Sequence, residues 1–131
     1  MKKQNLIALL LAFVWVSLSE FLRNEWLFKE LWTAHFTEKG LIFPDAPING
    51  ALWGLWSLLY VLFLSWISDK VGFLEAAVVA WITGFVFMWL VIGNLGVLPF
   101  ALLPYAIPLS MLETGVGLWI VRAPIGRKAT D

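Results

Sequence analysis

The chain contains no cysteine and only one histidine. The absence of cysteine excludes disulfides, thiolate metal ligands, cysteine nucleophiles and dithiol redox chemistry. A single histidine, His35, cannot build a histidine-based metal cluster, so we expect no metal site and no cofactor. His35 alone would be available as an axial ligand for a haem-type pigment, but no second histidine supports that alternative.

Charged residues are also scarce: they make up 14% of the 131 residues, whereas an ordinary soluble domain has roughly 25%. Nine Lys and Arg balance nine Asp and Glu, so no basic excess points to a nucleic-acid partner. Hydrophobic residues make up 61% of the chain, against about 45–50% in a soluble domain. This composition indicates an integral membrane protein whose main partner is the lipid bilayer.

Four apolar stretches are each long enough to cross a bilayer as a helix of about 20 residues. Asp69, Lys70 and Gly72 separate the second from the third, and residues 93–96 separate the third from the fourth. In lipid, each backbone N–H and C=O needs a partner within its own segment, so we predict helices rather than strands. The predicted helices cover about residues 5–22, 48–68, 73–92 and 99–121. The expected fold class is therefore an all-α integral membrane protein, with one four-helix transmembrane domain over residues 1–131.

Residues 23–46, between the first and second predicted helices, mix charges with aromatic side chains. This pattern is typical of an amphipathic segment, and Glu25 and Lys29 at a four-residue spacing would support a helix within it. Gly40 favours a stop. Two arrangements stay open: the first helix continues past the membrane, or the segment bends and lies on the membrane surface.

Basic residues predict the orientation, because the cytoplasmic flanks of membrane helices are enriched in Lys and Arg. They precede the first predicted helix and follow the last one: Lys2, Lys3, Arg122, Arg127 and Lys128. The connection from Glu20 to Asp45 has five acidic and three basic residues, so we expect it outside. Both termini are therefore predicted to lie inside (N-in/C-in).

The N-terminus also imitates a cleavable signal peptide, with two lysines, an apolar run from Leu6 to Val16, and Ser17-Leu18-Ser19. However, the apolar pattern continues at Phe21 and Leu22, and no polar mature domain follows. We therefore expect the first apolar stretch to remain as a membrane helix.

Glu113 is the one clear ionisable residue at membrane depth, ~12 Å inside the cytoplasmic end of the last predicted helix. A charge at a helix centre costs about 2.5–3.5 kcal/mol on insertion scales, which makes Glu113 a candidate ligand or proton site. Burial without a cation favours the neutral acid, which could bind or relay a proton. The alternative is a packing role, in which the neutral acid forms a hydrogen bond to a neighbouring helix.

Three further residues belong to this predicted ligand or proton site. Glu75 lies roughly one turn below the inner surface and could converge with Glu113, or it could face headgroups beside Lys70. Glu20 and Arg23 lie at the outer end of the first helix, where a three-residue spacing allows an ion pair. Arg23 could instead bind a phosphate or carboxylate of a ligand.

Pro104 and Pro108 lie in the first half of the last predicted helix and cannot donate backbone hydrogen bonds. We expect them to break this helix, as at many transporter sites, or simply to kink it so that it fits a bundle. In the second helix, Gly50 and Gly54 match the small-xxx-small pattern of close helix contacts.

The layout of the chain combines four predicted spans within 131 residues, a Glu in the last helix and an aromatic segment after the first helix, Glu25-Trp26-Leu27-Phe28-Lys29-Glu30-Leu31-Trp32. In this layout it resembles small bacterial inner-membrane proteins of uncharacterised families. The resemblance implies a multi-pass protein of the bacterial cytoplasmic membrane, and it implies no activity.

Three functions fit these observations, and the expected one is a non-enzymatic small subunit. Such a subunit would pack against itself or partner membrane proteins, as a homo-oligomer or in a larger membrane complex. The second function is a proton-linked transporter or channel for a small or apolar solute that uses Glu113. The third is a lipid-modifying membrane enzyme with Glu113 or His35 as general base, although we assign no catalytic residue because no catalytic set is present.

Overall fold

The structure is a computed structural model that describes residues 5–124 of the chain. Within this range the regular structure is helical, with no strand. Two helices contain a π-helical turn and one begins with a 3-10 turn. The elements in chain order are α1 (Leu6–Phe21), η1 (Leu22–Leu27), α2 (Lys29–Glu38), α3 (Pro47–Ser68), α4 (Phe73–Trp81), η2 (Ile82–Val86), α5 (Phe87–Asn94), η3 (Phe100–Leu102) and α6 (Leu103–Arg122).

Four helices are long and apolar enough to cross a membrane: Leu6–Leu27, Pro47–Ser68, Phe73–Asn94 and Phe100–Arg122. The predictions of an all-α fold and of four such helices are confirmed. The first helix does not end near Leu22, because η1 continues it to Leu27. A separate helix, α2, then follows from Lys29 to Glu38, so the segment after the first span both extends that span and forms a helix of its own.

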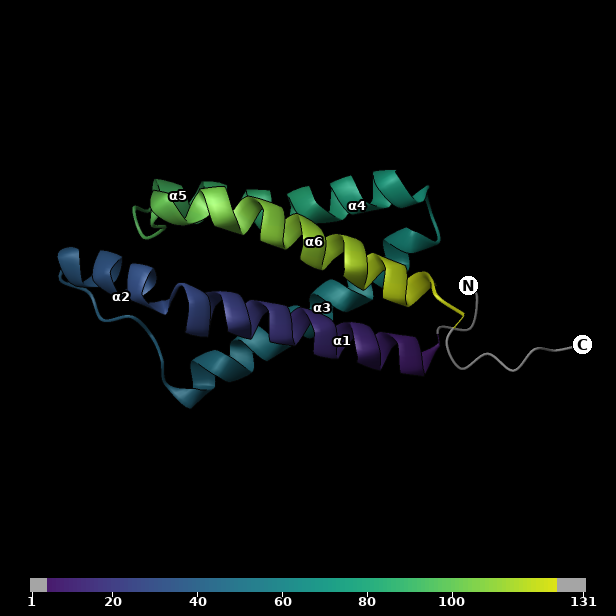
Figure 1. The fold of residues 1–131 in the computed structure, drawn as a ribbon, viewed down its shortest axis with the longest axis horizontal. Helices are drawn as coiled ribbons and strands as arrows, with labels where there is room; N and C mark the ends of the chain where they lie inside the picture. Colours follow the sequence, from purple (N-terminus) through teal and green to yellow (C-terminus); the bar gives the residue numbers. More distant parts are fainter. Residues whose placement is uncertain (1–4, 125–131) are drawn as a thin grey trace, which may run out of the picture.

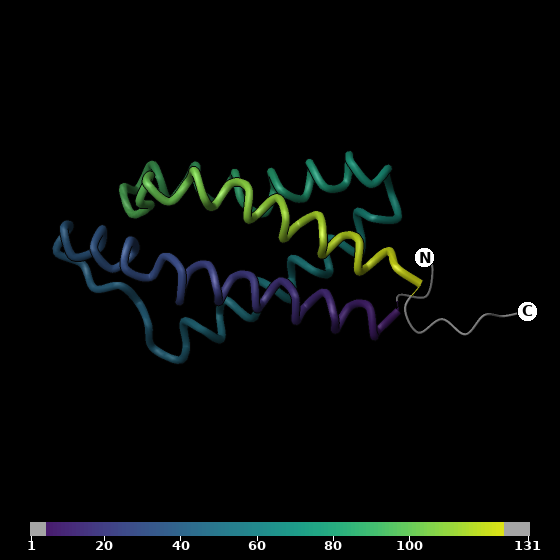
Figure 2. The backbone as a smooth tube through the Cα atoms, viewed as in Figure 1, coloured from purple at the N-terminus to yellow at the C-terminus, as the bar shows by residue number. Residues whose placement is uncertain are grey.

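Candidate spans that follow one another in the chain run in opposite directions (Figure 1). The start of α1, the α3–α4 turn and the end of α6 lie at one end of the bundle, called here the Arg122 end (Figures 1 and 2). The opposite end, called the α2 end, holds α2 and the turn between α5 and η3. Gly96 forms that turn at a φ of 76°, a conformation that favours glycine.

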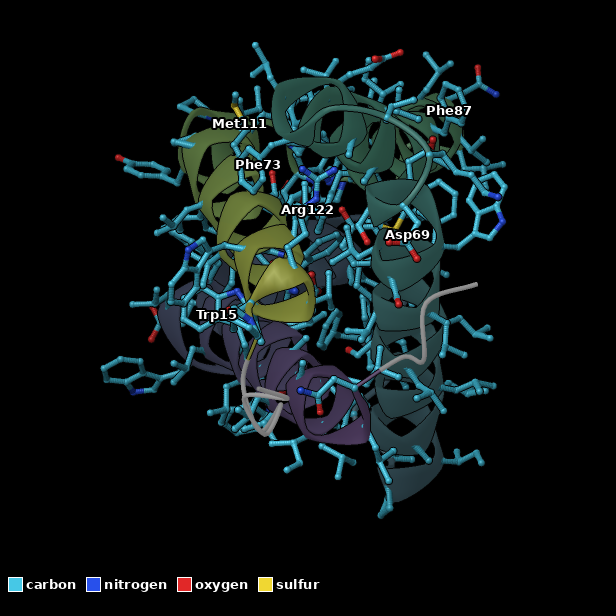
Figure 3. All side chains as sticks on the ribbon, turned by 90° about the vertical axis from the view of Figure 1, so that its right-hand side faces the viewer. Trp15, Asp69, Phe73, Phe87, Met111 and Arg122 are labelled. Atoms are coloured by element: carbon cyan, nitrogen blue, oxygen red, sulfur yellow. The ribbon has the colours of Figure 1, made fainter. Side chains whose placement is uncertain are left out.

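Arg122 closes the Arg122 end of the bundle. Its Nη2 donates to the carbonyl oxygens of Ser68 at 2.8 Å and Val71 at 2.7 Å, and its guanidinium carbon lies 5.5 Å from the centre of the Phe73 ring. Figure 3 looks onto this end, where Arg122 lies near the turn between α3 and α4. The other basic residues on which the predicted orientation depends, Lys2, Lys3, Arg127 and Lys128, lie outside the described residues.

Small and polar side chains line much of the inside of the bundle, together with a few large apolar ones such as Leu64 and Phe85, and many other large apolar side chains face outward. One stripe along α1 is buried at four-residue intervals: Ala8, Ala12, Val16 and Glu20. On its outer surface the same helix exposes Leu10 (55%) and Phe21 (58%). Small inward residues let helices approach closely, and an apolar outer surface suits hydrocarbon rather than water.

The proline-containing part of the last helix is less broken than its sequence suggests. The irregular turn is η3, which precedes Pro104, and Pro104 lies in the first turn of α6. Pro108 lies inside α6, which continues through it to Arg122. A proline in the first turn removes no helical hydrogen bond, which explains why Pro104 is accommodated there.

Candidate functional site

Arg23 lies between two carboxylates in the interior of the bundle. Its Nη1 donates to Oε2 of Glu113 at 2.8 Å, and its Nη2 donates to Oε1 of Glu20. The exposed fraction is 4% for Glu20, 5% for Arg23 and 1% for Glu113. These three residues, called here the charged cluster, join the first candidate span to the last one.

Two π-helical turns meet at Arg23. Glu20 continues the inward stripe of α1, and Arg23 follows three residues later in η1, where its carbonyl accepts the Phe28 N–H at 3.0 Å. The second turn, η2, contains the buried Phe85, whose ring centre lies 5.4 Å from the guanidinium carbon of Arg23. π-helical turns occur frequently at functional sites, because they interrupt the regular rotation of side chains around a helix.

Neutral side chains hold the carboxylates in place. Asn24 Nδ2 donates to Glu20 Oε2 at 3.1 Å, and Trp32 Nε1 of α2 donates to Asn24 Oδ1 at 3.1 Å. On the other side of the charged cluster, Trp15 Nε1 donates to the backbone carbonyl of Glu113 at 2.9 Å. The charged cluster is therefore fixed to α1, α2 and α6.

The charged cluster holds more acid than base. Two carboxylates share one guanidinium, and Glu113 Oε1 is buried without a hydrogen-bond partner among the described residues. A buried charge that lacks a partner is costly, so a proton on one carboxylate or a second cation would stabilise this arrangement. The charged cluster can therefore bind one proton, and a second cation beside the carboxylates can take the place of that proton.

Two cavities lie beside the charged cluster, at the α2 end of the bundle. The larger has a volume of about 490 Å³ and lies between α1 and the first half of α3; it is called here the α1–α3 cavity. The smaller has a volume of about 230 Å³, contains Arg23 in its lining, and has aromatic walls that include Trp32, Phe43 and Trp89. Both cavities are lined by Glu20 and Asn24, so Glu20 stands between them.

A second polar group, which the sequence analysis missed, lies on the side of the charged cluster nearer the Arg122 end. The Tyr60 hydroxyl donates to the Ala80 carbonyl at 3.2 Å and lies 2.7 Å from Thr114 Oγ1, so it links α3, α4 and α6. Trp81 Nε1 donates to Ser110 Oγ at 2.9 Å. The available signal was the position of Thr114, directly after Glu113 in an apolar helix.

The structure brings together three of the four acidic and basic site residues predicted from the sequence. Glu20, Arg23 and Glu113 meet in the charged cluster, whereas Glu75 is exposed in the first turn of α4. In the first turn of α4, Ala76 faces the core and Glu75 faces outward. Glu75 therefore does not converge with the buried Glu113. The structure places Pro104 and Pro108 in α6, upstream of Glu113.

His35, the other candidate residue, lies away from the charged cluster. Its Nε2 lies 2.8 Å from the Gly96 carbonyl oxygen, so it links α2 to the turn between α5 and η3. This contact gives His35 a packing role at the α2 end.

Comparisons with protein families, with curated proteins and with solved structures find no match to this chain. Inferences about its function therefore depend on the residues of the site.

Proposed function

We propose that this chain is a multi-pass membrane protein that moves a small solute in a proton-linked manner, with the charged cluster as the coupling site. The observation that supports this proposal is the unpartnered Oε1 of Glu113, in a buried cluster with one more carboxylate than guanidinium groups. Intramembrane ionisable residues of this kind are typical of proton relays and substrate pathways.

Coupling would depend on how Arg23 divides its single positive charge between two carboxylates that it binds at the same time. When Glu113 is ionised, Arg23 compensates Glu20 only in part, and a proton on Glu113 leaves the guanidinium charge to Glu20. Glu20 lines both cavities, so protonation at Glu113 would change the charge that a bound solute meets. Linkage is reciprocal: the solute would shift the proton affinity of the charged cluster by the same factor.

The proposed orientation is N-in/C-in, in a bacterial cytoplasmic membrane. Among the described residues, Lys70 and Arg122 lie at the Arg122 end, and a basic end is expected to face the cytoplasm. The two cavities would then lie toward the outside. The bundle is small, so we propose that it works as a homo-oligomer.

A packing role as a small subunit is the second candidate function. The observation in its favour is the surface of α3, where a Cβ added to Gly50 or Gly54 would meet nothing within 4 Å. Two small residues four positions apart allow another membrane helix to approach closely. Light scattering of the detergent-solubilised protein tests this role, and a strictly monomeric particle without co-purifying partners would exclude it.

Proton-linked transport can be tested in proteoliposomes that contain the pH dye pyranine. Small amines, carboxylates and neutral aromatic solutes are added one at a time, and the internal pH is followed for wild type, Glu113→Gln and the control Glu75→Gln. We expect at least one solute class to move protons through wild type and Glu75→Gln. Glu113→Gln should lose this movement, because an amide has the size of the acid but cannot exchange a proton.

Two results would contradict the proposal. One is equal proton movement through wild type and Glu113→Gln, which would remove Glu113 from the mechanism. The other is the absence of solute-dependent proton movement in every class, which would favour the packing role.

A further inference from the structure

We propose that the α1–α3 cavity binds an organic cation with an aromatic body, and that such cations are the substrate class of the site. The assignment as a substrate depends on the proposed transport function. Binding itself does not, and it can be measured separately.

The first argument is the charge of the lining. Three carboxylates border the cavity, namely Glu20, Glu25 and Asp45, and none of its described lining residues is Lys, Arg or His. Glu20 shares Arg23 with Glu113, so its charge is only partly compensated. Asp45 has no ion pair among the described residues, and the lining as a whole favours a positive ligand.

Glu25 is the one lining carboxylate with a surface partner. It lies 3.2 Å from Lys29 Nζ, with 30% of its side chain and 42% of that of Lys29 exposed. An exposed pair of this kind is weak, because water screens it and both side chains remain mobile. Glu25 is therefore available to a cation in the cavity at little cost.

The second argument is the chemistry of the walls. Phe21 and Trp53 border the same cavity, together with Leu18 and two prolines. Aromatic faces attract cations, and sites for quaternary ammonium groups are built as cages of aromatic rings. The α1–α3 cavity therefore combines aromatic faces with three carboxylates.

The cavity also has the size of a ligand site. Its volume of about 490 Å³ lies within the range of roughly 300–1,000 Å³ that is typical of small-molecule pockets. Small residues on α3 keep it open, because Gly50, Gly54 and Ser57 line it where larger side chains would fill it. At this point α3 diverges from α1 toward the α2 end (Figure 1).

The test uses three probes of similar shape and different charge. Benzyltrimethylammonium is the cation, neopentylbenzene is its neutral isostere, and phenylmethanesulfonate is an anion of similar shape. Equilibrium dialysis of the detergent-solubilised protein measures binding of labelled benzyltrimethylammonium, and the other two are added as competitors. We expect saturable binding of the cation, with no competition from the anion and weak competition from the neutral compound.

Variants locate the binding in the cavity. Asp45→Asn and Glu25→Gln should each weaken cation binding about fivefold, the effect of one charge at ~4 Å in a water-like dielectric. Gly54→Leu should also weaken binding, because its side chain extends into the cavity. The control Asp69→Asn removes an exposed carboxylate on the α3–α4 turn and should leave binding unchanged.

Three results would overturn this inference: no saturable cation binding, equal binding of the anion, or unchanged binding in both Asp45→Asn and Gly54→Leu. Circular dichroism checks that Gly54→Leu folds. If Gly54→Leu does not fold, Asp45→Asn still tests the inference, because Asp45 is exposed and its substitution leaves the core unchanged. If wild type binds no cation and Gly54→Leu no longer forms oligomers, a second copy of the chain fills the cavity.

The outcomes separate this inference from the proposed function. Cation binding without proton movement in liposomes would contradict transport and leave the cavity assignment intact. Proton movement with a neutral or anionic solute, without cation binding, would contradict the cavity assignment and leave transport intact.

Discussion

Arg23 and Glu113 lie 90 positions apart in the sequence, and their side chains meet at 2.8 Å inside the bundle. The contact joins the first and the last candidate spans through a guanidinium that also pairs with Glu20. The two partners are not equivalent, because loss of Arg23 leaves two buried carboxylates whereas loss of Glu113 leaves one ion pair. The stability of the protein should therefore depend more on Arg23 than on Glu113.

We expect Arg23→Met to lower the free energy of unfolding by ~3–5 kcal/mol, as when one partner of a buried ion pair is removed. Glu113→Gln should cost less, ~0.6–1.7 kcal/mol, the range of interhelical hydrogen bonds in membrane proteins. Unfolding in mixed micelles with increasing denaturant measures both values.

Lys29→Met is the matched control, because it removes the cation of the exposed Glu25–Lys29 pair. It should change stability by less than about 1 kcal/mol. If Arg23→Met proves as mild as this control, the charged cluster does not hold the two spans together.

The four candidate spans could be predicted from the sequence because length and hydropathy are properties of the residues themselves. Glu113 could be singled out for a similar reason: a carboxyl group in an apolar run is unfavourable unless it has a partner. The Glu20–Arg23 pair followed from a three-residue spacing on a helix. None of these inferences requires knowledge of how the helices face one another.

The contact between Glu113 and Arg23 was not predicted, because it depends on how the first and the last helices face one another. A first helix that ends at Leu22 leaves Arg23 outside the span, and only the π-helical turn η1 carries the helix on to Leu27. A π-helical turn has no clear signal in the sequence. Depth alone left two alternatives for Glu75, convergence with Glu113 or a position facing the headgroups. The rotation of α4 decides against convergence, because it turns Ala76 to the core and leaves Glu75 exposed.

Gly84 should tolerate no side chain, because Tyr60 occupies the space beside it. A Cβ on Gly84 would lie 2.5 Å from Tyr60 Cε2. The ring cannot move away easily, since Trp56 stacks on it at 4.9 Å between ring centres and its hydroxyl is bound to α4 and α6. We expect Gly84→Ala to destabilise the protein by ~1–3 kcal/mol, the usual cost of overpacking a core.

Gly115→Ala is the control for this substitution, since a Cβ there would meet nothing within 4 Å. Thermal unfolding followed by circular dichroism compares the two variants. Alanine favours helix over glycine, so Gly115→Ala should be neutral or slightly stabilising. An equally stable Gly84→Ala would show that Tyr60 is not packed against η2 as described.

The orientation of the chain can be tested with single cysteines, because the sequence contains none. Glu38, at the end of α2, and Asp69, after α3, are exposed and lie at opposite ends of the bundle. A membrane-impermeant maleimide should label Glu38→Cys in intact cells, and it should label Asp69→Cys only after the membrane is permeabilised. This result is expected because Lys70 and Arg122 lie at the same end as Asp69, and basic ends remain in the cytoplasm. Labelling of Asp69→Cys in intact cells, with Glu38→Cys protected, would reverse the orientation and turn both cavities toward the cytoplasm.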